Sequence, residues 1–122
     1  QEMSRGLGDV YKRQVLFSDK MRLPTLIFDE IDSGTSGKVA NVIGDLMKKI
    51  GFESQIIAIS HLAQVAAKAS NHFKVYKILS SNKPKTLLRK LNHEERIEEI
   101  AAMISADNIT NPALDQAIEL LK

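Results

Sequence analysis

The sequence predicts an α/β domain built around a parallel-sheet core. Two apolar runs, Leu26–Phe28 and Ile56–Ile59, have the continuous hydrophobic character of strands that are buried on both sheet faces. Residues 36–50 lie between them, and their apolar side chains recur three and four positions apart, which predicts a helix. A strand, a helix and a second strand in this order are typical of a parallel pair. A hairpin and two C-terminal helices are predicted to follow.

The composition fits one modest globular domain or a piece of a larger one. The 122 residues are 43% hydrophobic and 26% charged, with a net charge of +2. So small a charge neither requires nor excludes a nucleic-acid partner. The absence of cysteine excludes disulfides and thiolate metal sites, and no apolar run approaches the roughly 20 residues of a membrane span. Because position 1 is not Met, we expect the chain to begin within a longer protein.

Local signals place the other elements. Cations in the last turn of the helix at 36–50, and Gly51 after it, mark that helix's end. Asn92 with Glu95 predicts a capping box, and Thr110 shortly before a proline predicts another helix start. In chain order we predict a broken helix in 1–22, strand 25–29, helix 36–50, strand 56–59, helix 62–69, half-exposed strand 72–78, a turn at 82–84, strand 86–91, helix 93–104 and a last helix from 110.

Polar side chains follow both buried strands at their carboxyl ends. Asp29 and Glu30 follow the first apolar run, and His61 follows the second. The carboxyl ends of neighbouring parallel strands share one edge of a sheet, so Glu30 and His61 are expected at the same edge. There, one acid can hold Mg²⁺, its neighbour can deprotonate a water molecule, and an imidazole can hydrogen-bond a phosphate. His72 and His93 have no such setting, and we assign them no role.

The turn after these acids is not a phosphate-binding loop. That motif needs Gly, four residues, and then Gly-Lys-Ser/Thr. Only two residues separate Gly34 from Gly37, and Val39 stands where the hydroxyl side chain is required. No other stretch qualifies. The chain therefore offers a candidate Mg²⁺ acid and a candidate base but no cradle for phosphates.

These segments resemble the RecN family, bacterial double-strand-break repair ATPases related to SMC proteins and ABC ATPases. Residues 23–37, Leu-Pro-Thr-Leu-Ile-Phe-Asp-Glu-Ile-Asp-Ser-Gly-Thr-Ser-Gly, resemble the family's Walker B and D-loop segment. Ile59–Ala66 resembles its switch-histidine segment, and residues 72–77 and 95–101 resemble its closing region. The resemblance spans about residues 15–122 and implies the C-terminal lobe of a P-loop ABC-type ATPase head.

The resemblance implies a role for each site residue. Asp29 would hold Mg²⁺, Glu30 would be the catalytic base and His61 would sense the γ-phosphate of ATP. Asp32 would bind nucleotide from a loop that reaches across a dimer interface. The cofactors would be ATP and Mg²⁺, and the full protein would pair its heads as a homodimer on DNA double-strand ends. It would act in the bacterial cytoplasm at the nucleoid, without a membrane. Lacking a phosphate loop, the chain alone is predicted not to hydrolyse ATP.

The N-terminus departs from the family. Gln1–Arg5 resembles the tail of the signature motif, and Ser4 is its nucleotide-binding candidate. Residues 6–14 break the amphipathic pattern expected next, and we interpret them as foreign to the family. The predicted organisation is therefore an atypical segment at 1–14 and the C-terminal ATPase lobe at 15–122.

Three other interpretations stay open. Asp29 and Glu30 could only open a surface loop. The chain could be a non-enzymatic dimerisation or DNA-binding module, or an unrelated Mg²⁺-dependent α/β enzyme that uses Asp29 and Asp32. Cations near the predicted hairpin could contact nucleic acid, although a solvated sheet edge is the favoured interpretation because aromatic residues are not interleaved with them. These cations are Lys83, Lys85, Arg89 and Lys90.

Overall fold

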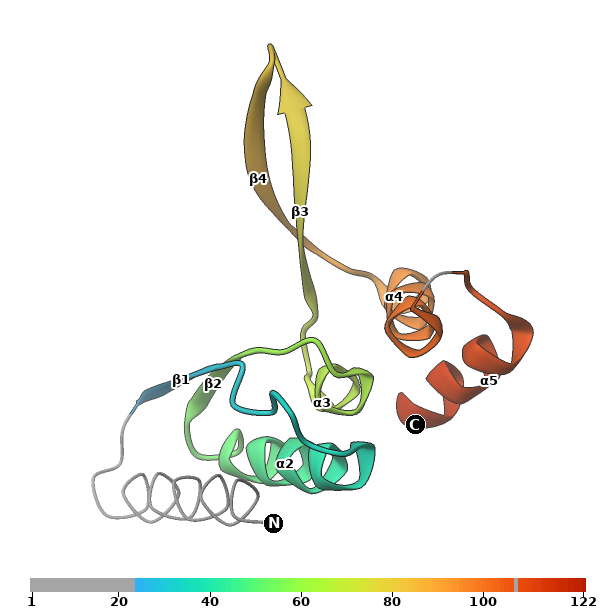
Figure 1. Cartoon of the computed structure of the whole chain (residues 1–122). Helices are drawn as coiled ribbons and strands as arrows, with labels where there is room; N and C mark the ends of the chain where they lie inside the picture. The colour runs from blue at the N-terminus through green and yellow to red at the C-terminus, as the bar shows by residue number, and fades with distance from the viewer. Residues whose placement is uncertain (1–23, 107) are drawn as a thin grey trace. The chain divides into compact units, whose positions relative to one another are not determined.

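A computed structural model describes residues 24–106 and 108–122 (Figure 1). The chain divides into two compact units, the first ending at Lys68 and the second running from Ala69 to Lys122. The predicted broken helix at 1–22, the atypical segment at 1–14 and Ser4 lie outside the described residues.

The first unit alternates strands and helices, as predicted. Its elements are β1 (Thr25–Asp29), α2 (Gly37–Ile50), β2 (Gln55–Ile59) and α3 (Ala63–Lys68). β1 and β2 pair in parallel, with Thr25 opposite Gln55 at one end and Asp29 opposite Ile59 at the other. The parallel pair confirms the predicted core, and it brings the two strand ends level with each other.

One face of this strand pair is packed against helices. Phe28 on β1 is buried with Ile43 and Met47 of α2 and Val65 of α3, in one apolar cluster. α2 approaches α3 closely at Gly44, where an added Cβ would lie only 3.1 Å from the backbone oxygen of Gln64. The three- and four-residue apolar spacing of α2 confirms the predicted helix, and it places an apolar face against the strands.

The opposite face of the strands is open, which corrects the expectation of burial on both faces. Ile27 is 66% exposed, and Ile57 and Ile59 are exposed as well. These three side chains share one face because successive strand residues alternate and the register pairs Ile27 with Ile57. α2 and α3 pack in the same apolar cluster on the other face. A continuous apolar run shows that a strand can be buried on both faces, but it does not show that both faces are covered. No layer among the described residues covers this face.

The second unit begins with a hairpin of β3 (Phe73–Ser80) and β4 (Lys83–Lys90) (Figure 1). Ser80 pairs with Lys83, so the connection is the two residues Ser81 and Asn82. Both have positive φ, 51° and 60°, as the two-residue turns of twisted hairpins require. The turn therefore comes earlier than the predicted 82–84, and β4 starts before the predicted 86.

The alternation along β3 has the opposite sense from the usual half-buried strand. Lys74 and Tyr76 are partly buried, whereas the apolar Phe73 and Val75 are exposed. Val75 lies opposite Leu88, and the two are 64% and 66% exposed. The predicted half-exposed strand is therefore present, and its exposed positions include apolar residues.

Two helices complete the second unit. α4 (His93–Ser105) begins with the predicted capping box, in which the Glu95 backbone N–H donates to Asn92 Oδ1 at 2.8 Å and Glu95 accepts in return. α5 (Asn111–Leu120) begins after Thr110, whose hydroxyl accepts from the Ala113 backbone N–H. Ile100 of α4 is fully buried in this unit. None of the helices in the described residues is both long and apolar enough to cross a membrane.

Candidate functional site

Two acids and an imidazole stand at the carboxyl ends of β1 and β2. Asp29 is the last residue of β1 and lies opposite Ile59. The Glu30 backbone N–H donates to the Ile59 carbonyl oxygen at 2.8 Å, so the pairing continues one residue past the strand. Asp29, Glu30 and His61 are all exposed. The structure thus brings the side chains predicted for metal binding, base catalysis and phosphate sensing to neighbouring strand ends, open to solvent.

Glu30 has an unusual backbone. Its φ is 49°, in the left-handed region where a side chain costs about 1–2 kcal/mol. Its N–H is held by Ile59, and its carbonyl oxygen accepts from the Ser33 N–H at 3.1 Å. Strained non-glycine residues of this kind cluster at functional sites, where the surrounding structure holds them. Glu30 is one of four non-glycine residues with positive φ in the described part of the chain, and it is the one that the sequence predicts to be catalytic.

Asp32, in contrast, is directed into the protein. It is 1% exposed, and its Oδ2 accepts a hydrogen bond from the Ser60 hydroxyl. Its Oδ1 is buried and has no hydrogen-bond partner among the residues that the structure describes. The Asp32 carbonyl oxygen accepts from Thr35 Oγ1 at 2.7 Å. In this conformation the Asp32 carboxylate is not presented to a partner, so its predicted reach across a dimer interface would need the loop to move.

Ser60 is a residue that sequence reasoning did not single out for a role. Besides donating to Asp32, its Oγ accepts from the Leu62 backbone N–H at 3.0 Å. Ser60 therefore ties the loop after β1 to the loop after β2, which carries His61. The available signal was a hydroxyl residue at the carboxyl end of a strand, immediately before that histidine.

The Asp29 carboxylate fits the role of one ligand to a metal ion whose other ligands include phosphate oxygens. No group of three or more His, Cys, Asp or Glu side chains in the described part of the chain can hold a metal ion by itself. Mg²⁺ in nucleotide sites does not need such a cage, because one or two carboxylates and the phosphate oxygens suffice. Asp29 is exposed and forms no ion pair with any described residue. The donor set fits Mg²⁺ bound together with a nucleotide.

Curated relatives decide the family. The chain is 47% identical over 103 residues to DNA repair protein RecN of Rickettsia conorii and 41% identical over 108 residues to that of Haemophilus influenzae. It is 37% identical over 107 residues to RecN of Bacillus subtilis. The chain is homologous to one segment of RecN. These alignments cover 84–88% of this chain and 19% of each relative, so the chain spans about a fifth of their length.

The RecN relationship confirms the resemblance drawn from the sequence motifs. No protein-family model matches the chain. A solved structure from work on ATP-driven dimerization and DNA-stimulated activation of SMC ATPases is similar, with a TM-score of 0.54 and 22% identity. This similarity covers 67% of this chain and 48% of that chain. It confirms the predicted fold class, an α/β core of the ATPase-head type.

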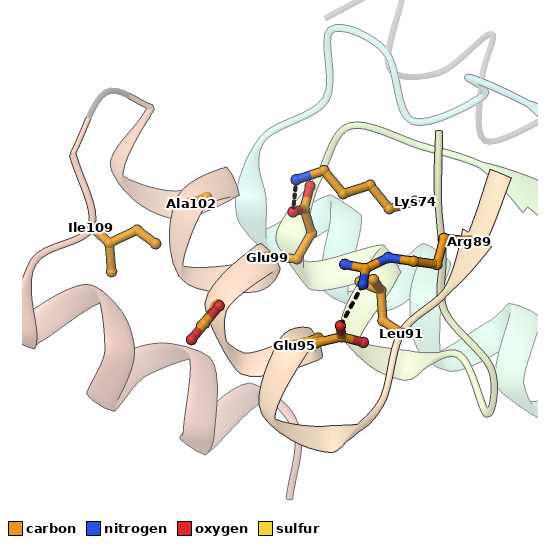
Figure 2. A pocket seen from close by; sticks show the side chains of 8 residues that line it. Lys74, Arg89, Leu91, Glu95, Glu99, Ala102 and Ile109 are labelled. Carbon is orange, nitrogen blue, oxygen red and sulfur yellow. Dashed lines mark hydrogen bonds and ion pairs between the residues drawn. The ribbon is translucent and has the colours of Figure 1, made fainter. Parts of the chain in front are cut away.

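The second unit of this RecN-related chain contains a pocket with a mixed lining (Figure 2). None of the predicted site residues lies in it. Two of its cations are paired with acids of α4: Lys74 with Glu99, and Arg89 Nη1 with Glu95 Oε1 at 2.7 Å. The pocket is lined by Lys74, Arg89, Leu91, Glu95, Glu98, Glu99, Ala102 and Ile109.

His72 gives the RecN-related chain a predictable pH dependence. Burial lowers the pKa of His72 below its usual 6.5; the charges of Arg96 and Lys74 lower it further, and Glu99 opposes them. The unfolded chain therefore binds this proton more tightly than the folded chain. We expect the free energy of unfolding to fall as pH drops below about 6.5, and to level off below the folded-state pKa. Urea unfolding between pH 7.5 and pH 5 measures this.

Substituting His72 separates its contribution from that of other groups. His72→Gln should flatten the pH dependence over that range. His93→Gln is the matched control, because His93 is an exposed residue of the same unit. An unchanged slope in His72→Gln would contradict the assignment.

Proposed function

We propose that this chain supplies the Walker B, D-loop and switch-histidine part of a RecN-type ATPase that acts in DNA double-strand-break repair. One observation carries the proposal: the parallel register of β1 and β2, which sets the Asp29–Glu30 pair beside the strand end that leads to His61. The homology to RecN supports the choice of ATP hydrolysis among the reactions that such a site can serve.

Each side chain has a distinct task in this proposal. Asp29 would hold Mg²⁺, and the ion would supply positive charge that offsets the negative charge of the phosphates. Glu30 accepts the proton of the attacking water, a task that suits a solvent-accessible carboxylate. His61 donates a hydrogen bond to the γ-phosphate. The assignment of Ser4 and Asp32 as further nucleotide contacts stays a prediction from the family resemblance.

Ser60 and Asp32 form the support of this site. The two loops that carry the reacting groups are joined by the Ser60–Asp32 hydrogen bond, which is partly buried. A catalytic group must be held in position to be effective, because small displacements of reacting atoms cost rate. We therefore assign Ser60 a positioning role toward His61 and the loop that follows Glu30.

The phosphate-binding half of the site comes from another part of the full protein in this proposal. The chain has no phosphate loop, and the open face of Ile27, Ile57 and Ile59 suits coverage by a further layer of the same head. We propose that two such heads pair around ATP as a homodimer, act on DNA ends and work in the bacterial cytoplasm at the nucleoid.

The isolated chain is therefore expected to be inactive as an ATPase. We predict no MgATP turnover by the purified 122 residues above the rate of buffer alone, measured as phosphate release. The physical reason is that Asp29 and Glu30 act on a nucleotide only when its phosphates are held in place. Steady turnover that Glu30→Gln abolishes would contradict the proposed division of the site.

We do not propose the alternative of an unrelated Mg²⁺ enzyme that uses Asp29 and Asp32. The Asp32 carboxylate is buried and accepts a hydrogen bond from Ser60, whereas Asp29 is exposed. The two side chains thus lie in different environments. The alternative of DNA binding is favoured by a separate observation, the basic charge of the hairpin in the second unit.

A further inference from the structure

The hairpin of the second unit is strongly cationic. We call β3, its turn and β4 (residues 73–90) the basic ribbon. It contains no Asp or Glu, and it carries six cations, whereas the whole chain has a net charge of +2. The chain outside the ribbon is therefore net acidic. The cations of the ribbon are Lys74, Lys77, Lys83, Lys85, Arg89 and Lys90.

Internal ion pairs account for only part of this charge. Lys74 and Arg89, which are paired with each other across the strands, are bound by Glu99 and Glu95 of α4 (Figure 2). These contacts fix one end of the ribbon on a helix. Lys77, Lys83 and Lys85 lie toward the turn and form no ion pair with any residue in the described ranges. Their charge is free to meet an external anion.

The register distributes these lysines over both faces of the ribbon. Lys77 lies opposite Thr86, whereas Lys85 lies opposite Ile78 and Lys83 opposite Ser80. Since side chains alternate along a strand, Lys77 points to one face and the other two point to the opposite face. Lys83 and Lys85 are two residues apart, which places them about 7 Å from each other along the strand.

Exposed apolar side chains stand between the cations. Leu79 near the turn is 82% exposed and lies opposite Pro84. Val75 and Leu88 form an exposed cross-strand pair, and Phe73 lies opposite Lys90. Strand pairing thus interleaves apolar and aromatic residues with the cations. This arrangement becomes visible only when β3 and β4 are paired.

We propose that the basic ribbon binds the backbone of duplex DNA, with Lys77, Lys83 and Lys85 at phosphates and Leu79 against the groove. A two-stranded ribbon fits the major groove of B-DNA, whose walls offer phosphates on both sides of the inserted element. Cations on both faces match that arrangement, whereas a flat anionic membrane would meet one face only. Each DNA strand carries one phosphate charge per about 3.4 Å of axis, so phosphates are spaced closely enough for Lys83 and Lys85 each to contact one. The proposal rests on the proposed repair function but requires no nucleotide.

The test uses the intact 122-residue chain without ATP. A fluorescent 30-base-pair duplex is titrated at several KCl concentrations from 50 to 200 mM, and anisotropy reports binding. The triple variant Lys77→Gln, Lys83→Gln, Lys85→Gln should bind at least about tenfold more weakly at 50 mM KCl. The slope of log affinity against log salt concentration should be smaller in magnitude by about two to three for this variant, since each phosphate contact contributes about 0.9 to the slope. The corresponding triple Arg variant should keep both affinity and slope.

The matched control removes the same charge elsewhere. Lys38→Gln, Lys48→Gln and Lys49→Gln change three exposed lysines of α2, and this variant should bind within about threefold of the unaltered chain. Equal losses in the two triple-Gln variants would overturn the proposal, as would equal affinity for single-stranded DNA. Binding to phosphatidylserine vesicles without binding to the duplex would overturn it in favour of a membrane surface. ATP turnover plays no part in these measurements, so the ribbon proposal and the ATPase proposal can fail separately.

Discussion

Ser60→Ala is expected to lower the free energy of unfolding of the first unit by about 2–3 kcal/mol. The Ser60 hydroxyl is the donor to the Asp32 carboxylate, which is 1% exposed. The other carboxylate oxygen has no partner among the described residues, so the substitution would leave a buried charge without a donor from this contact. Hydrogen exchange at the Leu62 amide, together with urea unfolding followed by circular dichroism, measures the effect, because that amide loses its acceptor as well.

Two comparisons make this result specific. Ser33→Ala, at an exposed position in the same loop, should change stability by less than about 0.5 kcal/mol. Adding Asp32→Asn to Ser60→Ala should recover part of the loss, because a neutral amide costs less to bury than a carboxylate. A Ser60→Ala variant as stable as Ser33→Ala would show that the Ser60–Asp32 bond does not join the two loops.

Glu30→Gln is expected to cause the largest functional loss. It is best measured in RecN of Haemophilus influenzae in which residues 24–122 of this chain replace the residues aligned with them, because the graft restores a complete protein. We predict a fall in ATP turnover of about 10²- to 10⁴-fold, or about 3–5 kcal/mol in the barrier, from the loss of the proposed general base. ATP affinity should stay within a few-fold, since the amide keeps the size of the carboxylate.

The control for Glu30→Gln is Glu53→Gln. Glu53 is exposed in the turn that follows α2, before β2 begins, and it has no predicted role. Turnover of this second graft should match that of the unaltered graft. A similar loss in both variants would indicate general damage rather than removal of a base.

Local signals predicted most of the secondary structure of this chain. The caps at Asn92 and Thr110 were predictable because a short polar side chain there satisfies a backbone N–H of the first helical turn. The parallel pairing of β1 with β2 was readable because a helix-length segment separates two apolar runs. These features depend on residues close together in the chain, which is why the sequence alone was enough.

Burial and register depend on partners and were harder to predict. The open face of Ile27 and the exposed pair of Val75 with Leu88 could not be foreseen, because burial is a property of what covers a strand. The turn was predicted at 82–84 because proline favours turns. Pro84 instead lies in β4 opposite Leu79, since proline is tolerated on an edge strand. The sequence placed Asp32 in a loop. Its burial and the hydrogen bond that it accepts from Ser60, 28 residues later, depend on the fold.

In the proposed function, Glu30 and His61 act together on one bound ATP at adjoining strand ends. The most direct test is a double-mutant cycle in the grafted RecN, with ATP turnover measured for Glu30→Gln, His61→Ala and the double variant. Groups that act as a unit in one reaction give strongly non-additive losses. We expect the double variant to lose no more activity than about the larger of the two single losses. A double loss equal to the product of the single losses would contradict it.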